Sequence, residues 1–423
     1  MKISGVNMHI LLLFVALLLE SHSIYAQTLG DVILKIQLIN PLPVSREDEL
    51  ILIPVSSLLQ RNPAFDKTNF WIKSAGDTIP YEITSGNEIA LVLNFTLNEE
   101  KELVFLEGRV SNSNLRKRTQ AYLGKKSNYK YADKYYTGGE FVGVVEDKVP
   151  ADHFPHNGLY QYEGPGWESE RVAYRFYLDE RNRTDIFGKK TENLIVDKIG
   201  KNDLISDGKE SYTKMNEWGE DIFKVGSSLG MGSLAAEVNG KIMTISKCDS
   251  ILCHINNHQS FSTVTTDYYG WLIDNDAVNI SVTHSINAGN RLTKVSASLS
   301  KNIPYLVTGL AKSDKTEYFQ SEKENGSTWG YIAIWGKQAL SGDELGLCIF
   351  YQEDRLYSIA EDELNRIVKL KLPKNEIIYY FGAAWIQEPN GIKTKEDFTK
   401  YLNKTRRLLS YPIDIVFDSS IGR

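Results

Sequence analysis

Short apolar runs bounded by turn residues recur along this chain, and they restrict its fold more than any other feature. Residues 32–38 alternate apolar and polar side chains before Pro41 and Pro43, and residues 50–55 and 89–93 are further apolar runs of strand length. Runs of this kind predict strands. They do not alternate with helical segments, as the strand–helix repeats of Rossmann and TIM-barrel folds require. The sequence therefore predicts a mainly β fold.

The same pattern divides the 423-residue chain into parts. We expect a small N-terminal β-sandwich over residues 27–112, a polar connecting segment over residues 113–150 and a large antiparallel β-sandwich over residues 151–423. One helix is predicted at Lys395–Ser410, where Thr394 can cap the first turn. The strands predicted for the large part are residues 172–178, 241–246, 268–273, 278–286, 294–299, 331–335 and 377–384.

The N-terminus has the three parts of a cleavable signal peptide. Lys2 supplies the positive charge, residues 10–19 supply the apolar run, and small or polar residues lead to a cleavage position after Ala26. The apolar run is too short for a membrane span, which needs roughly 20 residues. We therefore expect residues 1–26 to be removed and the protein to reach the periplasm without a membrane anchor. The net charge of −6 and the lack of a basic stripe argue against a nucleic-acid partner.

The three cysteines are too few for a disulfide scaffold. Cys248 and Cys253 are near enough in sequence to bridge a hairpin in an oxidising compartment, and Cys348 lies in an apolar run that predicts a buried strand with a free thiol. No zinc-site spacing, calcium loop, phosphate loop or dinucleotide-binding motif is present. We therefore predict no metal site and no cofactor, while scattered acids leave calcium binding open.

Residues 152–190 concentrate histidines, acids, arginines and aromatic rings in one stretch. Within the strand predicted there, alternate residues share a face, so Arg171, Arg175 and Tyr177 lie opposite the apolar set. Two guanidinium groups and a phenol on one face would suit an anion such as a carboxylate. The alternative is that both arginines pair with neighbouring acids. The apolar set, predicted to face the core, is Val172, Tyr174, Phe176 and Leu178.

Two further groups of residues are candidates for chemistry or binding. His153 and His156 flank a Phe-Pro pair and could transfer protons near neutral pH, or could simply bond to the loop backbone. Residues 216–221 read NEWGED, in which Trp218 could stack on a sugar while Asp221 binds hydroxyl groups. The alternative for this segment is a packed turn with its tryptophan in the core.

Several motifs carry a resemblance to a known family. The string YEGPGWESER at residues 162–171 is the most specific of them. With the other motifs it resembles the family catalogued as domain of unknown function 4861, along almost all of the chain after the signal peptide. The supporting motifs are YRFY at 174–177, DIFGKK at 185–190, NEWGED at 216–221, VGSSLG at 225–230 and WGKQ at 335–338.

The resemblance implies both a fold and an activity. Family members tend to be exported Bacteroidota proteins of polysaccharide-utilisation systems, notably for pectin and ulvan. The implied fold is a large β-sandwich like that of galactose mutarotase and several polysaccharide lyases. The implied activity is a dehydratase that removes water from a saturated terminal uronic acid of an oligosaccharide and leaves a 4,5-unsaturated end. A uronic-acid-containing oligosaccharide is therefore the expected partner, and the sequence specifies no oligomeric state.

Such an elimination needs three roles to be filled. Arg175, aided by Arg171, is the candidate for neutralising the uronate carboxylate, and Arg175→Ala is expected to abolish activity without unfolding the protein. Tyr177 or His156 could take the C5 proton, the phenol needing a pKa lowered by a nearby arginine. Candidates for protonating the departing hydroxyl group are His153, Tyr162 and Glu168. The remaining residues expected to bind substrate are Glu163, Trp167, Lys189, Trp218 and Asp221.

Other activities stay open. A lyase would use the same chemistry with a sugar as the leaving group. A glycoside hydrolase or epimerase is a second class, in which hydrolysis would use two acids, but their separation in space cannot be read from sequence. A non-catalytic carbohydrate-binding protein is a third. The acids considered are Glu163, Glu168, Glu217 and Asp221, and the rings of a binding platform would be Trp167, Trp218 and Trp335.

Overall fold

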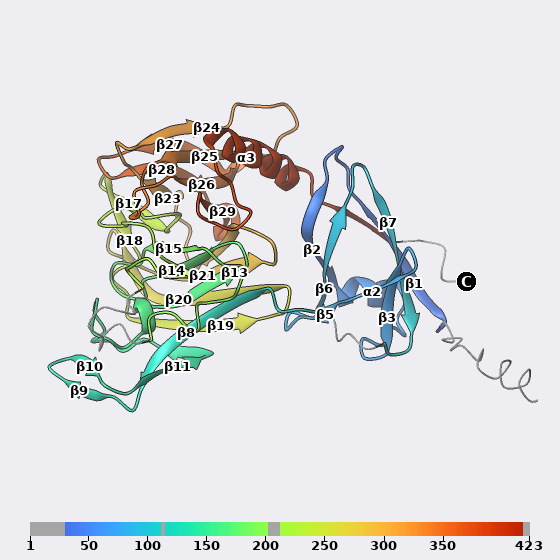
Figure 1. The fold of residues 1–423 in the computed structure, drawn as a ribbon, viewed down its shortest axis with the longest axis horizontal. Helices are drawn as coiled ribbons and strands as arrows, with labels where there is room; N and C mark the ends of the chain where they lie inside the picture. Colours follow the sequence, from blue (N-terminus) through green and yellow to red (C-terminus); the bar gives the residue numbers. More distant parts are fainter. Residues whose placement is uncertain (1–29, 111–114, 202–211, 418–423) are drawn as a thin grey trace, which may run out of the picture.

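The computed structural model describes residues 30–110, 115–201 and 212–417, and it shows two β-rich units side by side (Figure 1). The predicted signal peptide lies outside these residues. The described part is mainly β, as predicted, with several antiparallel sheets. It contains two α-helices, α2 (Val55–Arg61) and α3 (Lys395–Ser410). In this part of the chain no helix is long and apolar enough to cross a membrane.

The small unit packs two antiparallel sheets face to face around an apolar core. Alternate residues of its strands are fully buried, among them Ile36, Ile53 and Phe105. Its sheets run β30-β1-β7-β3-β4 and β2-β6-β5. The strands are β1 (Val32–Ile39), β2 (Arg46–Pro54), β3 (Phe70–Ser74), β4 (Asp77–Ile79), β5 (Glu82–Ile83), β6 (Glu88–Phe95), β7 (Glu100–Glu107) and β30 (Asp414–Phe417).

The strand β30 comes from the far end of the chain. After α3 the chain returns to the small unit and pairs antiparallel with β1, from Ile36 opposite Phe417 to Ile39 opposite Asp414. The predicted division assigned these residues to the large part. Residues 414–417 read DIVF, and so short an apolar run gives no sign of the sheet that it joins.

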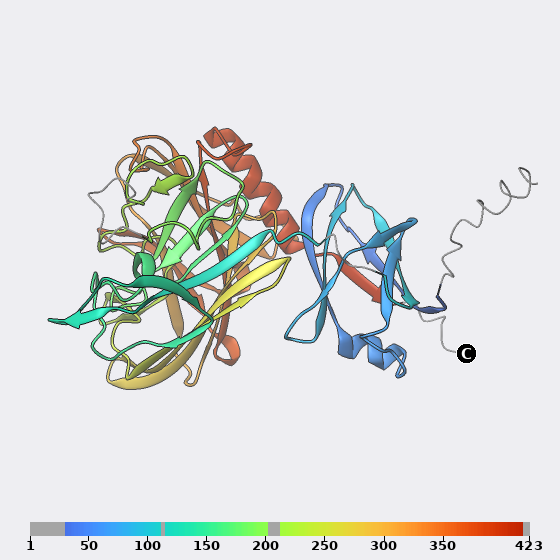
Figure 2. The same cartoon turned by 60° about the horizontal axis from the view of Figure 1, so that its bottom comes forward.

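The segment predicted as a connector, residues 113–150, contributes strands. Its first strand, β8 (Thr119–Ser127), buries Ala121 and Leu123 against the large unit. A short hairpin follows and projects from the body in both ribbon views (Figures 1 and 2). The polar composition of the segment concealed these strands. The others are β9 (Lys130–Ala132), β10 (Tyr135–Thr137), β11 (Glu140–Val144) and β12 (Glu146–Lys148).

The large unit stacks antiparallel sheets of nine, six and five strands. The nine-stranded sheet runs β12-β19-β20-β21-β22-β29-β26-β25-β24, the six-stranded sheet runs β11-β8-β13-β14-β15-β16, and the five-stranded sheet runs β18-β17-β23-β28-β27. The remaining bounds are β13 (Gly166–Ser169), β14 (Ala173–Phe176), β15 (Thr184–Lys189), β16 (Gly219–Asp221), β17 (Ala235–Val238), β18 (Lys241–Thr244), β19 (Ser250–Asn257), β20 (Phe261–Ile273), β21 (Asp276–Asn287), β22 (Leu292–Leu299), β23 (Tyr305–Ala311), β24 (Thr316–Gln320), β25 (Trp329–Gly336), β26 (Leu345–Gln352), β27 (Leu356–Glu361), β28 (Asn365–Lys371) and β29 (Glu376–Trp385).

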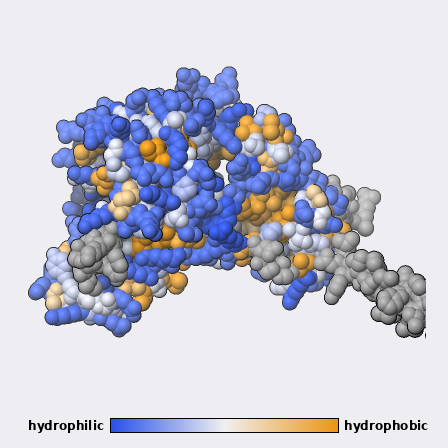
Figure 3. Space-filling view, in the orientation of Figure 1, coloured by the Kyte–Doolittle hydropathy of each residue, from blue (hydrophilic) through white to orange (hydrophobic). Residues whose placement is uncertain are grey.

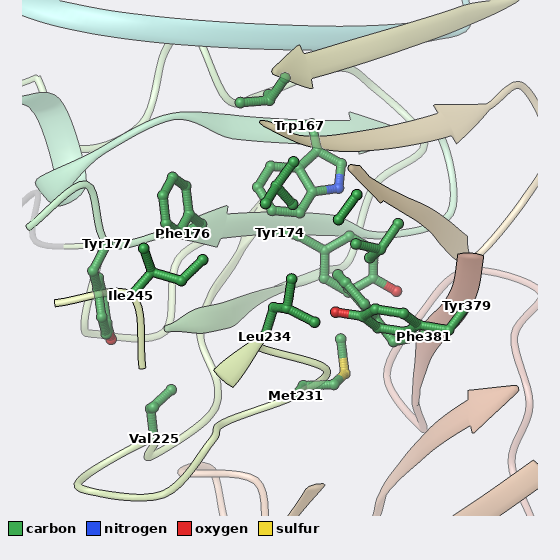
Figure 4. Packing of buried hydrophobic residues seen from close by; sticks show 14 of the residues in the cluster. Trp167, Tyr174, Phe176, Tyr177, Val225, Met231, Leu234, Ile245, Tyr379 and Phe381 are labelled. Carbon is green, nitrogen blue, oxygen red and sulfur yellow. The ribbon is translucent and has the colours of Figure 1, made fainter. Parts of the chain in front are cut away.

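The main core of the large unit lies between the six-stranded and nine-stranded sheets. Tyr174 from the first sheet packs edge-on to Phe381 of the second, and Trp167 lies beside Tyr174 (Figure 4). Each strand predicted in the large part overlaps an observed strand. The predicted helix is confirmed as α3, whose Thr394 side chain accepts a hydrogen bond from the backbone N–H of Asp397 at 3.1 Å.

The cysteines differ in part from the prediction. Cys248 and Cys253 are both free thiols, so the predicted disulfide is absent. The reason is the strand β19, because an extended chain advances about 3.3 Å per residue and carries Cys253 away from Cys248. Cys348 is a buried free thiol on β26, as predicted.

Candidate functional site

The YRFY motif forms β14, and pairing across the sheet fixes which of its side chains face which way. Tyr174 lies between Trp167 and Ile186, and Ala173 lies between Glu168 and Phe187. Tyr174 and Phe176 face the core, as predicted, and are 0% and 2% exposed. Arg175 lies on the opposite face, also as predicted. That face is covered as well, since residues 195–199 pack over it.

Arg175 is held by two carboxylates. Its guanidinium group donates to Asp185 Oδ2 at 2.7 Å and to Asp221 Oδ2 at 2.5 Å, and it is 3% exposed. The phenol of Tyr177 donates to the same oxygen of Asp185 at 2.5 Å. The alternative in which Arg175 pairs with neighbouring acids is therefore the one observed, and this face is no open anion-binding surface. We call Arg175, Tyr177, Asp185 and Asp221 the buried network.

Burial dominates the protonation of the buried network. It raises the pKa of Asp221 in spite of the Arg175 charge, and Asp221 Oδ1 has no hydrogen-bond partner among the described residues. Burial also raises the pKa of Tyr177, and Asp185 adds to the rise, while Arg175 only opposes it. The expectation that arginine would lower the pKa of this phenol is wrong, because desolvation outweighs the favourable charge.

Three predicted site residues have a structural role. Glu168 and Lys189 are both 0% exposed and form an ion pair at 2.7 Å. Glu168 also accepts hydrogen bonds from the backbone N–H groups of Ile195 and Val196 at 2.5 and 2.8 Å, which fastens the covering segment to the sheet. Trp167 is fully buried and donates to Thr293 Oγ1 at 2.8 Å, so its ring offers no exposed face for a sugar.

The Tyr-Glu-Gly turn at the start of the family motif has an unusual backbone. Tyr162 and Glu163 take positive φ angles of 38° and 72° in succession, although neither is glycine or asparagine. Such a conformation is costly for residues with a Cβ atom and is held by its surroundings. Tyr162 donates to the carbonyl of Val196 at 2.7 Å, and a Cβ atom at Gly164 would lie 2.1 Å from the carbonyl oxygen of Phe176. The turn therefore fixes the position of Glu163.

Glu163 joins a histidine and an arginine at the surface. Its Oε1 lies 2.6 Å from His156 Nδ1 and 2.9 Å from a guanidinium nitrogen of Arg181. Arg181 also pairs with Asp179, and its guanidinium carbon lies 4.0 Å from the ring centre of Tyr177. The His156 side chain is 74% exposed. Because Nδ1 faces Glu163, Nε2 on the other side of the ring is free to meet a ligand.

A pocket of about 200 Å³ adjoins this histidine, and sequence reasoning did not find it. Its wall includes His156 together with Lys126, Tyr135 and Tyr136. Lys126 is 3% exposed, and its ammonium lies 3.7 Å from the centre of the Phe141 ring on the neighbouring strand. Among the described residues this ammonium has no hydrogen bond and no ion pair. Burial accordingly lowers its pKa.

The adjacent Lys125 has the carboxylate partner that Lys126 lacks. Lys125 pairs with Asp147 at 2.6 Å and is 30% exposed. Neighbours on a strand face opposite ways, so one lysine reaches a carboxylate while the other lies under the hairpin. A partly buried cation without a counter-ion is destabilising, and a ligand that carries an anion would offset this cost. Lys126, the pocket and the His156–Glu163 pair together form the candidate site.

The remaining predicted residues do not line this pocket. Arg171 pairs with Glu192 at 3.5 Å. The half-buried Trp218 packs edge-on to Phe187, with 6.0 Å between their ring centres. His153 is half-buried beside Tyr160, and burial lowers its pKa. Across the described ranges no group of three or more His, Cys, Asp or Glu side chains could hold a metal ion.

The fold and the site together define a class: a two-unit antiparallel β protein with a buried acid–arginine network and a lysine-containing pocket. The chain belongs to the family described as Domain of unknown function (DUF4861), whose family model matches residues 38–415. This confirms the family predicted from the motifs.

Comparisons with individual proteins are more distant. The "Uncharacterized protein P7" of Formosa agariphila is 25% identical over 280 residues, which cover 59% of this chain and 66% of that protein. A glycosyl hydrolase family 38 protein of Enterococcus faecalis gives a TM-score of 0.46 at 8% identity. An alpha-mannosidase of Enterococcus faecalis V583 gives a TM-score of 0.45 at 9% sequence identity. Each structural match covers 96% of this chain and only about half of the larger protein, and such values carry no conclusion about activity.

Proposed function

We propose that this protein is a carbohydrate-active enzyme that eliminates water from a terminal uronic acid of an oligosaccharide and leaves a 4,5-unsaturated sugar. The observation that carries the proposal is the ammonium of Lys126, which has no carboxylate partner among the described residues and belongs to a pocket with phenols and an imidazole. A uronate carboxylate would give this cation its missing partner. We place the reaction in the periplasm, because residues 1–26 have the pattern of a signal peptide.

Lys126 would act on the hardest part of the reaction. A proton on the carbon beside a carboxylate is only weakly acidic, since its removal builds further negative charge on that group. A cation placed against the carboxylate stabilises this charge in the transition state. Binding would also reverse the effect of burial on Lys126, because an opposite charge nearby favours the protonated ammonium. This role replaces the one expected for Arg175, whose charge is already matched by Asp185 and Asp221.

The two proton transfers can be assigned to residues at the same pocket. His156 Nε2, with Glu163 fixing the ring, takes the C5 proton. The electrons of that C–H bond form the C4–C5 double bond as the C4–O bond breaks. Burial raises the pKa of Tyr136, so its phenol stays protonated and can donate to the departing hydroxyl group. Water leaves, and the proton that His156 took from C5 passes through solvent to the phenolate, which restores both side chains.

Product analysis tests this proposal. Purified protein is incubated with saturated uronyl oligosaccharides, and the products are followed by ultraviolet absorbance and mass spectrometry. We expect new absorbance and the loss of one water with the chain length unchanged. Two shorter products, one of them unsaturated, would identify a lyase instead. New reducing ends without unsaturation would identify a hydrolase, and no product at all would overturn the proposal.

A matched pair of lysine variants ties the product to the pocket. Lys126→Met keeps an unbranched side chain of nearly the same length and removes its charge, and we expect turnover to fall by roughly a hundredfold or more. Lys125→Met makes the same change at the neighbouring position, where the lysine pairs with Asp147 outside the pocket. We expect this control to keep most of the activity. Thermal unfolding of both variants shows whether either has lost its fold.

A further inference from the structure

Beside the pocket, the β9–β10 hairpin presents a group of exposed tyrosine rings. Tyr129, Tyr131 and Tyr135 are 44%, 46% and 47% exposed, which is high for side chains of this size. The hairpin projects from the large unit (Figures 1 and 2). Its turn is tight, because Asp133 and Lys134 both take positive φ angles, of 52° and 69°. The strands thus hold these rings at a defined place.

The rings are packed against one another rather than loose. The centres of Tyr129 and Tyr131 lie 4.8 and 4.7 Å from that of Tyr136. The Tyr131 hydroxyl donates to Asp152 Oδ2 at 2.5 Å, and Tyr135 packs edge-on to Phe154 at 5.3 Å. Each exposed ring therefore has one side fixed by protein and the other open to solvent. Rigid amphipathic rings of this kind cover the apolar face of a sugar at a small entropic cost.

The hairpin is continuous with the pocket. Tyr136 lines the pocket, and its ring packs against those of Tyr129 and Tyr131, while Tyr135, the preceding residue on the same strand, lines the same pocket. A sugar linked to one already in the pocket would therefore meet these rings. We call Tyr129, Tyr131, Tyr135 and Tyr136 the tyrosine hairpin.

The charged residues of the tyrosine hairpin indicate which kind of sugar it would bind. Lys130 and Lys134 are exposed on the hairpin and Asp133 is the only acid between them, although the whole chain carries a net charge of −6. The projecting lobe is mostly pale and blue in Figure 3, as polar aromatic and charged residues are. A protein partner would call for a larger apolar surface. Hydroxyl-bearing rings beside lysines suit an anionic oligosaccharide.

We infer that the tyrosine hairpin is a second sugar-binding subsite, so that the substrate is an anionic oligosaccharide whose terminal uronate enters the pocket while the following sugars lie on the hairpin. This inference rests on the proposed function for the identity of the terminal sugar. It adds a requirement for chain length, since a single uronic acid would fill the pocket and leave the hairpin empty.

Chain-length dependence of binding and turnover tests the inference. Uronic acid, disaccharide and tetrasaccharide probes are titrated by calorimetry against the full protein, Tyr131→Ala and Tyr357→Ala. Tyr357 is the matched control, because it is 55% exposed and stacks on Tyr305 on a different sheet. We expect the wild type and the control to bind the tetrasaccharide roughly tenfold more tightly than the single sugar. In Tyr131→Ala we expect most of this gain to be lost.

The outcomes separate the subsite from the reaction. Turnover without any effect of chain length, or with the same gain in Tyr131→Ala, would overturn the subsite and keep the proposed function. Binding that grows with chain length and depends on Tyr131, without unsaturated product, would keep the subsite and overturn the reaction. Light scattering tests whether a second copy of the chain, rather than a sugar, binds the tyrosine hairpin. A dimer of the wild type that dissociates in Tyr131→Ala, with sugar binding unchanged, would assign the hairpin to a second copy of the chain.

Discussion

Glu163 is the residue through which His156 would be positioned for chemistry. It contacts His156 Nδ1 at 2.6 Å, and Arg181 holds the carboxylate in turn at 2.9 Å. A charged carboxylate this near one ring nitrogen favours one orientation of the imidazole. The positive φ angle of Glu163 shows that the surrounding structure maintains this arrangement at a cost.

Replacing Glu163 with glutamine is predicted to slow the reaction more than it weakens binding. The amide removes the charge that orients His156, so kcat is expected to fall by roughly tenfold to a hundredfold with little change in KM. Steady-state kinetics on a uronyl oligosaccharide measures both. Glu192→Gln is the control, since Glu192 is half-exposed and pairs with Arg171 away from the pocket. An unchanged kcat in Glu163→Gln would remove this residue from the mechanism.

Single residues show where the sequence is informative and where it is not. The alternation of β14 correctly placed Tyr174 and Phe176 in the core and Arg175 on the opposite face. It could not show that this second face is covered too, because residues 195–199 come from another part of the chain. Lys126 was visible only as half of a lysine pair. Whether its ammonium has an ion-pair partner depends on which carboxylates lie nearby in the folded protein, and the sequence does not show this.

At the scale of elements, β14, β15 and β16 are joined by charge as well as by backbone hydrogen bonds. Arg175 on β14 bonds to Asp185 on β15 and to Asp221 on β16. Removing the cation would leave two buried carboxylates facing each other. Arg175→Ala is therefore predicted to lower the free energy of unfolding by about 3–5 kcal/mol, as is typical when one partner of a buried pair is lost. This replaces the expectation that the variant would keep its fold.

Denaturant unfolding of Arg175→Ala and Arg171→Ala tests that prediction. Arg171 is partly exposed, and its pair with Glu192 is long at 3.5 Å, so its loss is expected to cost no more than about 1 kcal/mol. Equal stability of the two variants would show that the ion pairs of Arg175 do not stabilise the fold. Circular dichroism of each variant before unfolding shows whether the native sheets are present.

Asp221 gives the buried network a pH dependence of known sign. Its folded pKa is raised, so the stability that it contributes is fully present below the ordinary aspartate pKa, near 4, and is lost as pH rises through the raised value. Asparagine does not titrate. Asp221→Asn is therefore predicted to gain stability relative to the wild type as pH rises.

Urea unfolding at about pH 5 and about pH 9 measures this difference. Asp276→Asn is the control, because Asp276 lies at the surface, where its side chain is 76% exposed. The stability difference between Asp276→Asn and the wild type is expected to stay nearly constant between the two pH values. For Asp221→Asn, a difference that stays constant or shrinks as pH rises would contradict the assignment.

Some elements were predictable because their signals are local. The helix α3 has a capping threonine and an apolar stripe within its own sequence, and its predicted bounds are confirmed. The strands of residues 119–148 were missed because their polar composition outweighs a weak alternation. The β9–β10 turn carries Asp133 and Lys134 where glycine or asparagine is usual, so it lacks the common hairpin signal.

At the scale of the whole molecule, the small unit needs both ends of the described chain. The strand β30 lies against β1, and Ile413 and Phe417 pack with the small core. A contact this far apart in sequence leaves no local pattern. It also means that the small unit lacks one strand of its sheet until synthesis reaches residue 417.

Ile413→Asp is predicted to destabilise the small unit by about 3 kcal/mol, since it places a charge in an apolar core. Val416→Asp is the control, because Val416 is 47% exposed on β30, which begins directly after Ile413. Hydrogen exchange of β1 and β7 is expected to quicken in the first variant and not in the second. Equal protection in both would show that β30 contributes little to the unit.

The central claim is that Lys126 recognises the carboxylate of the substrate. The most direct test is a cycle of two proteins and two ligands, in which calorimetry measures the binding of a uronyl oligosaccharide and of its carboxyl-reduced, neutral counterpart to the wild type and to Lys126→Met. We predict that the wild type prefers the acidic ligand by roughly tenfold to a hundredfold and that Lys126→Met binds the two ligands equally. A wild type that does not distinguish them, or a preference that survives in Lys126→Met, would contradict the account.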